Sequence, residues 1–200
     1  VAMEEECVVQ ERSAEVPPYR IRQLKQDWLK IYTAIVEHGR LQIRFNRRAR
    51  TVDLRTCEAT PDPSYIERGV SFLQAVFYGF RVEDAVALMR HRDVFMETFE
   101  LGDIRKLKRS HMSRAIGRII GREGRTKESI ENFSKCKFVL NDERIVILGC
   151  PENIKMAKDG IGRLVQGSEP SSIFARMRMT SLRLKEKYGS IQSIYEDLRQ

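Results

Sequence analysis

The sequence predicts an α+β fold of two tandem domains, each a small antiparallel sheet covered by helices. Two pairs of segments alternate apolar and polar residues, as hairpin strands do, and amphipathic helical patterns lie before and after each pair. A proline stands before the helix that follows each hairpin. The chain has 200 residues, 42% of them apolar, which is enough for two small cores.

The first half opens with an acidic segment. Residues 1–15 carry five glutamates and one arginine, so we expect a flexible, solvent-exposed acidic tail. Val16-Pro17-Pro18 then stiffens the entry to a domain. Residues 21–36 predict an amphipathic helix that ends at Gly39, with the apolar positions Leu24, Trp28, Ile31, Tyr32 and Ile35.

A hairpin and two helices complete the first half. L-Q-I-R-F at 41–45 and T-V-D-L-R-T at 51–56 alternate on either side of the turn N-R-R-A-R. Pro61 and Pro63 precede a helix predicted over 65–78, and a second helix is predicted over 82–90.

The second half predicts a strand, two helices around a glycine turn, a hairpin and a last helix. We expect the strand at 103–109, D-I-R-K-L-K-R, and a helix from about Ser113 that the turn Gly121–Gly124 interrupts. Thr126 is the candidate N-cap of the next helix. Strands follow at 135–142 and 144–149, and Pro151 opens a helix that ends at Gly167. The inward positions of the first helix are Ala115, Ile116, Ile119 and Ile120.

The two halves match at an offset of 93 residues. The matching pairs are Phe45 with Phe138, Val52 with Ile145, Leu54 with Ile147 and Cys57 with Cys150. We interpret them as an internal duplication. Hairpin periodicity alone is the alternative, since the matches are few and mostly apolar.

The glycine turn lies within I-G-R-I-I-G-R-E-G-R-T-K-E-S-I-E-N-F, residues 116–133. A Walker loop requires G-x-x-x-x-G-K-[ST], but Arg122 and Glu123 follow Gly121. A dinucleotide fingerprint requires G-x-G-x-x-G after a strand. Here a helix is predicted before the turn, and Gly117 and Gly121 are too widely spaced. Both nucleotide-binding motifs are therefore excluded.

The same segment suits a sugar–phosphate backbone. Gly121 and Gly124 lack a Cβ, and the start of the following helix favours anions. Between residues 105 and 127, nine Lys and Arg residues accompany a single acid, Glu123. The alternative is a packed helix pair with solvated arginines. The predicted RNA-binding residues are Arg114, Arg118, Ile119, Gly121, Arg122, Glu123, Gly124, Arg125, Lys127, Lys135, Lys137, Arg176 and Arg178.

The order helix, G-x-x-G, helix, two strands and helix resembles the type I KH domain over residues 104–167. The resemblance implies that the turn clamps about four nucleotides of single-stranded nucleic acid. The bases would lie between the first helix and the strand at 135–140. Glu123 departs from the basic or small residues that are commoner at such loop tips, and it would repel a phosphate.

The first half lacks a G-x-x-G, and W-L-K-I-Y-T-A-I-V-E-H-G-R stands in its place. The fold prediction is thus two tandem type I KH-like domains of order β-α-α-β-β-α, the first degenerate. The expected parts are the acidic tail 1–15, a degenerate KH-like domain 16–100, a KH domain 101–170 and a basic helical extension 171–200. A degenerate copy implies protein docking. The cluster Arg44, Arg47, Arg48 and Arg50 is either an RNA contact or a solvated hairpin tip.

The C-terminal stretch is basic as well. Its cations are Arg176, Arg178, Arg183, Lys185 and Lys187, and its apolar residues are Phe174, Met177, Leu182 and Leu184. We expect a helix along RNA phosphates. A helix packed on the KH body with solvated charges is the alternative.

A degenerate KH-like half before an intact one resembles the dual-KH assembly factor of the small ribosomal subunit, in its eukaryotic form. The strings that carry the resemblance are I-V-E-H-G-R-L-Q-I-R-F-N, G-F-R-V-E-D-A-V-A-L-M-R, S-R-A-I-G-R-I-I-G-R-E-G-R-T-K-E-S-I-E-N and N-I-K-M-A-K. The resemblance implies binding of precursor rRNA near its 3′ end. It also implies contact with the Nob-type endonuclease, platform ribosomal proteins and other assembly factors. The implied location is the nucleolus and nucleus, with cytoplasmic late particles. A KH-type mRNA-binding regulator is the alternative, although such proteins usually have several intact G-x-x-G loops.

Other functional classes find no support in the sequence. Cys7, Cys57, Cys136 and Cys150 form no C-x-x-C pair, so we expect no zinc site, disulfide framework or cofactor. No apolar run reaches the roughly 18 residues of a membrane span, and the acidic start is unlike a signal peptide. The three histidines are scattered, and we expect no enzymatic activity. The net charge of +8 and the pI near 9.5 favour a nucleic-acid partner.

Overall fold

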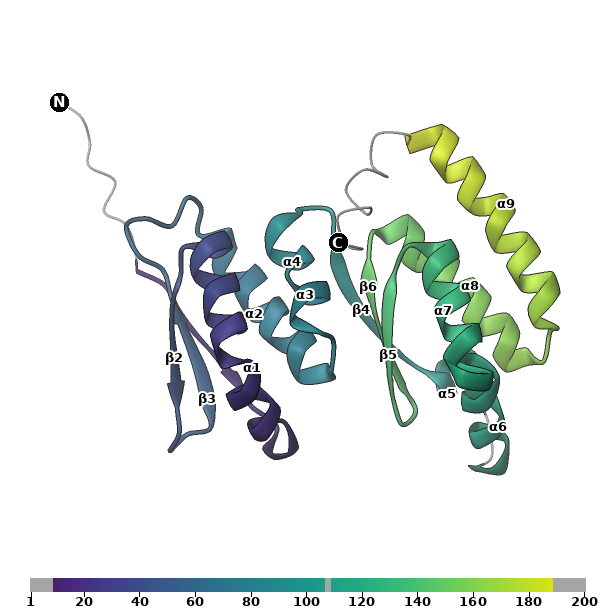
Figure 1. Cartoon of the computed structure of the whole chain (residues 1–200), viewed down its shortest axis with the longest axis horizontal. Coiled ribbons are helices and arrows are strands. Elements are labelled where there is room, and N and C mark those ends of the chain that lie inside the picture. The colour runs from purple at the N-terminus through teal and green to yellow at the C-terminus, as the bar shows by residue number, and fades with distance from the viewer. Residues whose placement is uncertain (1–8, 107–108, 189–200) are drawn as a thin grey trace. The chain divides into compact units, whose positions relative to one another are not determined.

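The protein contains two three-stranded antiparallel sheets, one in each half of the chain (Figure 1). The computed structural model describes residues 9–106 and 109–188. The described residues divide into two compact units on either side of the Arg92–Asp93 bond. The strand orders are β1-β3-β2 and β4-β6-β5, so the two sheets have the same topology. Their strands are Glu11–Glu15, Gln42–Asn46 and Thr51–Arg55 in the first unit, and Phe95–Glu100, Lys137–Asn141 and Arg144–Gly149 in the second.

The helices of the first unit lie on one face of its sheet. They are η1 (Pro18–Arg20), α1 (Ile21–Ala34), the π-helical turn η2 (Ile35–Gly39), α2 (Ser64–Tyr78), α3 (Val82–Ala85) and α4 (Ala87–Arg90). Leu24, Ile31 and Ile35 form the buried stripe of α1 and η2, as the 3–4 spacing predicts. Gly69 lets α2 approach the sheet, because a Cβ there would lie 2.9 Å from Leu54 Cδ1.

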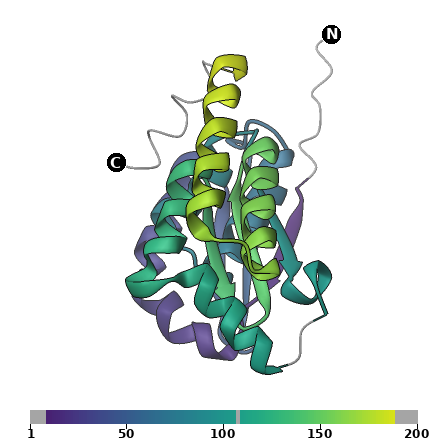
Figure 2. The same ribbon diagram turned by 90° about the vertical axis from the view of Figure 1, so that its right-hand side faces the viewer.

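The second unit has three layers. Its helices are α5 (Leu101–Ile104), α6 (Arg109–Ile120), η3 (Arg122–Gly124), α7 (Arg125–Ser134), α8 (Pro151–Gln166) and α9 (Pro170–Tyr188). Sheet residues such as Phe138, Ile145 and Ile147 share one core with Ile119 of α6 and Ile130 of α7. Helix α9 packs on α7 and α8 and forms the outer layer (Figure 2).

Apolar contacts fasten α9 to the KH body. Ile173 and Met177 are buried, and the rings of Phe174 and Phe133 lie 5.9 Å apart. Gly160 of α8 makes room for Met177, whose Sδ would lie 2.9 Å from a Cβ at that position. The predicted basic helix is therefore present as far as Tyr188, and one of its faces is part of the core of the second unit, while residues 189–200 of the predicted extension lie outside the described residues.

The prediction of a flexible acidic tail over residues 1–15 is wrong at its C-terminal end. Glu11–Glu15 form β1, which pairs with all of β3 from Thr51 to Arg55. Ala14 is buried while Ser13 and Glu15 are exposed, so the segment has the alternation of a strand, which its glutamates concealed. Residues 1–8, the rest of this predicted tail, lie outside the described residues.

The predicted strand at 103–109 is also wrong. The first strand of the second unit is β4, Phe95–Glu100, and it pairs with β6. Glu100 and Asp103 form a reciprocal capping box that turns the chain into α5 directly after the strand. Residues 93–100 therefore belong to the second unit rather than to the first, where the expected boundary at residue 100 placed them.

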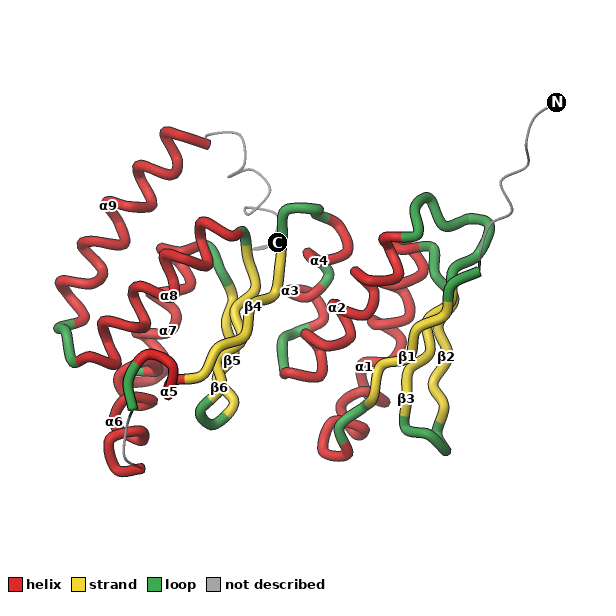
Figure 3. Tube along the Cα trace, turned by 180° about the vertical axis from the view of Figure 1, so that it is seen from behind, coloured by secondary structure: helices red, strands yellow, loops and turns green. Residues whose placement is uncertain are grey.

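Each sheet contains a hairpin, β2–β3 or β5–β6 (Figure 3), and the two hairpins differ in register. Ile43 lies opposite Leu54 in the first sheet, and Phe138 lies opposite Ile147 in the second. The turn at 47–50 is two residues longer than the turn at 142–143. Aligning Leu54 with Ile147 thus places Ile43, rather than Phe45, at the position of Phe138. Equal strand orders agree with an internal duplication in which the hairpin turn changed length.

The packing of α9 gives a stability prediction. We expect Met177→Ala to lower the free energy of unfolding by about 2–5 kcal/mol, because Met177 is 3% exposed and seated on Gly160. Met179→Ala is the matched control. Met179 is 55% exposed, so its truncation should change stability by less than about 0.5 kcal/mol. Chemical denaturation measures both, and equal effects of the two variants would contradict the packing described.

Candidate nucleic-acid interface

The turn between α6 and α7 has a backbone that only particular residues adopt. Gly121 has φ +73° and ψ 179°, and Gly124 has φ +77° and ψ 5°. Glu123 between them also lies in the left-handed region, with φ +53°. Three of four consecutive residues thus have positive φ, which reverses the chain within one turn and leaves its tip exposed.

The two glycines serve this turn differently. A Cβ on Gly121 would lie 2.2 Å from Thr126 Oγ1 and 2.9 Å from the Thr126 backbone nitrogen. Gly121 therefore permits the close approach of the turn to the first residues of α7. A Cβ on Gly124 would meet nothing within 4 Å, so this side of the turn is open to an incoming backbone.

Helix α7 begins at Arg125 with Gly124 as its N-cap, one residue before the predicted start. No side chain caps this N-terminus, and Thr126 does not take the predicted N-cap role. This N-terminus carries the positive end of the helix dipole, and its Gly124 and Arg125 N–H groups donate to the Gly121 and Arg122 carbonyls within the turn. It can therefore receive a phosphate oxygen.

Exposed guanidinium groups surround the turn. Arg114 and Arg118 lie on α6, Arg122 lies on the tip, and Arg125 opens α7. Glu123 and Arg125 form an ion pair of 2.8 Å between side chains that are 76% and 78% exposed. A pair so exposed is worth at most about 1 kcal/mol, so a phosphate can displace Glu123 from Arg125. Arg118 Nη1 lies 3.1 Å from the position of a Cβ on Gly167, beside the C-terminal end of α8.

The predicted RNA contact of Ile119 is wrong. Ile119 is fully buried in the core with Met112 and Ala115, which precede it on one face of α6 at 3–4 spacing. Ile120 is 38% exposed instead, although we expected it to face inward. Gly117 is exposed, and a Cβ added there would meet nothing within 4 Å outside the helix's own backbone. The exposed face of α6 beside the turn thus carries Ile120 and Gly117. The 3–4 spacing of Met112, Ala115 and Ile119 would have placed both of them outside the buried face.

Lys127 and Lys137 meet at Glu131 rather than projecting freely. Glu131 accepts a hydrogen bond from the Phe138 backbone N–H at 3.2 Å. It also lies 3.3 Å from Lys137 Nζ and 3.8 Å from Lys127 Nζ, with its side chain 13% exposed. This cluster fastens α7 to the edge strand β5. Lys135 caps α7 in the left-handed region, with φ +55°.

The remaining predicted residues lie on α9. Arg176 and Arg178 are exposed, and Arg176 Nε lies 3.4 Å from Asp159 Oδ2 of α8. The structure thus places twelve of the thirteen predicted residues in the turn with its arginines, in the Glu131 cluster, on α9 or in the core, and the thirteenth, Lys135, ends α7.

Other chemistries find little support among the described residues. They hold no group of three or more His, Cys, Asp or Glu side chains that could bind a metal ion. Burial raises the pKa of the Cys136 thiol to about 12, which makes it a poor nucleophile. Within the described part of the chain, every helix is too short or too polar to cross a bilayer.

The model of the eukaryotic type KH domain (KH domain type I) matches residues 98–181. The RNA-binding protein pno1 of Drosophila melanogaster is 47% identical over 88% of this chain and 73% of its own length. The pre-rRNA-processing protein pno1 of Schizosaccharomyces pombe is 44% identical over 89% of this chain and 74% of its own. This chain belongs to the PNO1 family.

Solved structures agree with membership of the PNO1 family. Dim2p of Pyrococcus horikoshii has 27% identity and a TM-score of 0.71, over 85% of this chain and 99% of its own. A chain of the a/eIF2alpha–aDim2p–rRNA complex of the same organism has 27% identity and a TM-score of 0.73, over 90% and 98%. A protein of unknown function from Aeropyrum pernix shares the fold, with 21% identity and a TM-score of 0.76, over 92% and 96%.

The first unit of this PNO1-family chain has no counterpart of the turn. Residues 16–41 join β1 to β2 with η1, α1 and its π-helical turn, whereas residues 101–136 join β4 to β5 with α5, α6, the glycine turn and α7. The first unit therefore lacks the helix pair that flanks the glycine turn in the second unit.

The turn geometry predicts opposite effects of two Gly→Ala substitutions. Gly121→Ala should lower the free energy of unfolding by about 1–3 kcal/mol, since its φ and ψ are adopted almost only by glycine and its Cβ would clash with Thr126. Gly117→Ala, four residues earlier on an open face of α6, should raise it by up to about 1 kcal/mol. Urea denaturation compares them, and a stable Gly121→Ala protein would contradict the geometry.

Proposed function

We propose that this chain binds single-stranded rRNA near the 3′ end of the small-subunit precursor and docks the endonuclease that matures that end. Its family consists of RNA-binding proteins of pre-rRNA processing, to judge from its relatives in Drosophila and Schizosaccharomyces pombe. The exposed glycine turn is the observation that carries the proposal. An rRNA complex among the structural neighbours supports the choice of RNA.

The turn acts as a clamp on the sugar–phosphate backbone. The strand passes over Gly124, where no side chain stands within 4 Å of the would-be Cβ. One phosphate lies at the N-terminus of α7, and Arg122 and Arg125 neutralise its neighbours. Arg125 exchanges its exposed partner Glu123 for a phosphate oxygen.

Bases from the clamped strand lie along α6 toward β5. Ile120 and Gly117 give this face of α6 an apolar, low surface on which a base can rest. Strand β5 is an edge strand, so its outer backbone groups can bond to base edges. The Glu131 cluster holds β5 and α7 at a fixed spacing, and it acts on RNA binding through that spacing.

A second basic surface lies on α9, where Arg176 and Arg178 are exposed. Because α9 packs on α7, contacts of α9 with phosphates reinforce the clamp. The first unit contributes protein docking, toward the Nob-type endonuclease, platform ribosomal proteins and other assembly factors. In this proposal the chain binds RNA and proteins and catalyses no reaction. It acts in the nucleolus and nucleus and on late precursor particles in the cytoplasm.

Charge reversal at the tip of the turn tests the clamp. Arg122→Glu should weaken binding of a labelled single-stranded RNA oligonucleotide about tenfold or more, since it places a carboxylate where a phosphate lies. It should also make the slope of log K against log salt shallower by about 0.7 for each lost contact. Fluorescence anisotropy measures both, with circular dichroism as the check on folding.

Lys155→Glu is the matched control for Arg122→Glu. Lys155 on α8 is exposed as well, and in the described contacts it pairs only with Glu152. An effect of Lys155→Glu as large as that of Arg122→Glu would mean that net charge, rather than the turn, drives binding.

The ion pair at the tip predicts a gain of affinity. Glu123→Gln should tighten RNA binding about two- to fivefold, because it removes a negative charge beside the phosphate and leaves Arg125 without an internal partner. Glu152→Gln on α8 is the control with the same charge change. Weaker binding by Glu123→Gln would show that Glu123 contacts the RNA favourably, against the clamp as described.

A further inference from the structure

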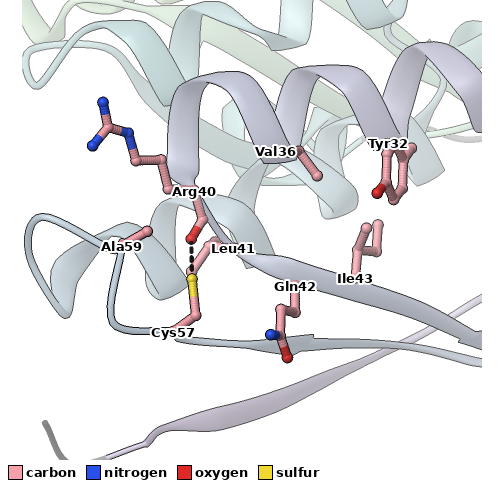
Figure 4. A pocket seen from close by; sticks show the side chains of 8 residues that line it. All are labelled: Tyr32, Val36, Arg40, Leu41, Gln42, Ile43, Cys57 and Ala59. Atoms are coloured by element: carbon pink, nitrogen blue, oxygen red, sulfur yellow. Dashed lines mark hydrogen bonds between the residues drawn. The ribbon is translucent and has the colours of Figure 1, made fainter.

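A groove runs between α1 and β2 of the first unit (Figure 4). Two hollows with volumes of about 410 and 610 Å³ form it, and they share Tyr32 and Ile43. The side chains of Tyr32 and Val36 point from the helix toward Ile43 of β2. The second hollow continues along α1 to Trp28 and along β2 to Phe45, whose rings lie 6.1 Å apart.

Helix α1 and its π-helical turn carry a second apolar stripe in addition to their buried face, and Tyr32 and Val36 of that stripe line the groove. Leu29, Tyr32 and Val36 are 75%, 45% and 36% exposed and follow one another at helical spacing. The core of the first unit already takes the other apolar side of this helix, at Ile31 and Ile35. A helix of a folded domain needs one apolar face, so the second stripe is available for a partner.

In the second unit α7 is the helix that precedes the edge strand, as α1 with η2 is in the first. There α7 packs against the sheet, and Glu131 accepts the N–H of Phe138 on the outer edge of β5. Ile43 occupies the position of Phe138 in the first sheet and faces the helix side, as Phe138 does. Strand direction and side-chain facing together fix the direction of the N–H. The Ile43 N–H therefore points outward along the edge of β2, beside α1 and η2, and the residues that line the two hollows include no carboxylate that could accept it as Glu131 accepts that of Phe138.

We propose that the groove between α1 and β2 binds an amphipathic helix of a partner protein that carries an apolar stripe and acidic flanks. Its apolar stripe packs on Tyr32, Val36 and Ile43. One of its carboxylates accepts the Ile43 N–H, as Glu131 accepts that of Phe138. The inference rests on the docking role proposed for the first unit and adds the surface and the chemistry of its ligand.

Charge at the rim selects the acidic partner. Lys25, Arg44 and Arg47 line the second hollow, and the described residues that line both hollows include no carboxylate. Arg44 is 75% exposed and pairs with Asp53 at 3.2 Å. Carboxylates on the flanks of a docked helix would meet these cations and gain both affinity and specificity.

Single-stranded RNA fits the groove less well. The first unit lacks the glycine turn that would hold a phosphate there. The hollow at η2 is lined by aliphatic side chains such as Val36, Leu41 and Ala59, which suit a helix stripe better than stacked bases. The experiment below includes RNA as a probe, so binding of RNA in the groove would be detected.

Trp28 gives a direct readout, because it is the single tryptophan of the chain and lies in the groove. The full chain is titrated, with tryptophan fluorescence as the signal, against three probes. The first is a synthetic helical peptide with a Leu/Phe stripe and Glu flanks. The second is the same peptide with Lys flanks, and the third is a single-stranded RNA oligonucleotide. We expect a saturable shift of Trp28 emission with the acidic peptide alone.

Matched variants place the binding site. Tyr32→Ala and Arg47→Glu should each weaken the acidic peptide about tenfold. Tyr19→Ala is the control, since Tyr19 is 77% exposed and lines neither hollow. Arg47 lies on an exposed hairpin turn, so its variant keeps the test valid if Tyr32→Ala disturbs folding.

Three results would overturn the proposal: no response of Trp28 to the acidic peptide, equal responses to both peptides, or a Trp28 response to RNA. Anisotropy of a labelled RNA in the same samples separates this failure from failure of the proposed function. Tyr32→Ala should leave RNA binding unchanged, because the clamp lies in the second unit.

Discussion

The close approach of Gly121 to Thr126 is the constraint on which the second unit depends. With no Cβ in the way, the chain reverses between α6 and α7 within four residues. The reversal exposes the N-terminus of α7 and sets Arg122 and Arg125 beside it. Glu131 then fixes the far side of α7 to β5. This close approach thus brings the N-terminus of a helix, the open side of the turn at Gly124 and two arginines to one place. Such a place favours binding of a sugar–phosphate backbone.

The first unit shows what the same sheet does without that contact. Its strand order is identical, but a single helix spans the distance that a helix pair spans in the second unit. With one α-helix in place of two, the first unit has no glycine turn, and a groove lies between α1 and β2. An apolar groove with a basic rim replaces a phosphate site. A duplicated fold can therefore hold two kinds of ligand, RNA at one copy and protein at the other.

Much of this was predictable from the sequence, because periodicity and glycine placement act locally. The hairpins, α1, α2, α8 and the turn follow from those signals, and the sheet topology confirms the type I KH arrangement. Which segments pair as neighbouring strands in each sheet was not predictable. Strand β1 looks like an acidic tail until β3 pairs with it, and β4 precedes the basic segment that alternates more clearly. In the site, Ile119 and Ile120 have the same chemistry, and only the direction in which α6 faces the core separates them.

The central claim concerns where RNA touches the protein, and amide chemical shifts report that position directly. Two-dimensional NMR of the isotopically labelled chain, titrated with a single-stranded RNA oligonucleotide, is the measurement. The account predicts the largest shifts at Gly121, Gly124 and Thr126, with smaller shifts along the exposed face of α6. Unchanged amides at those residues, with shifts confined to the first unit or to α9, would contradict it.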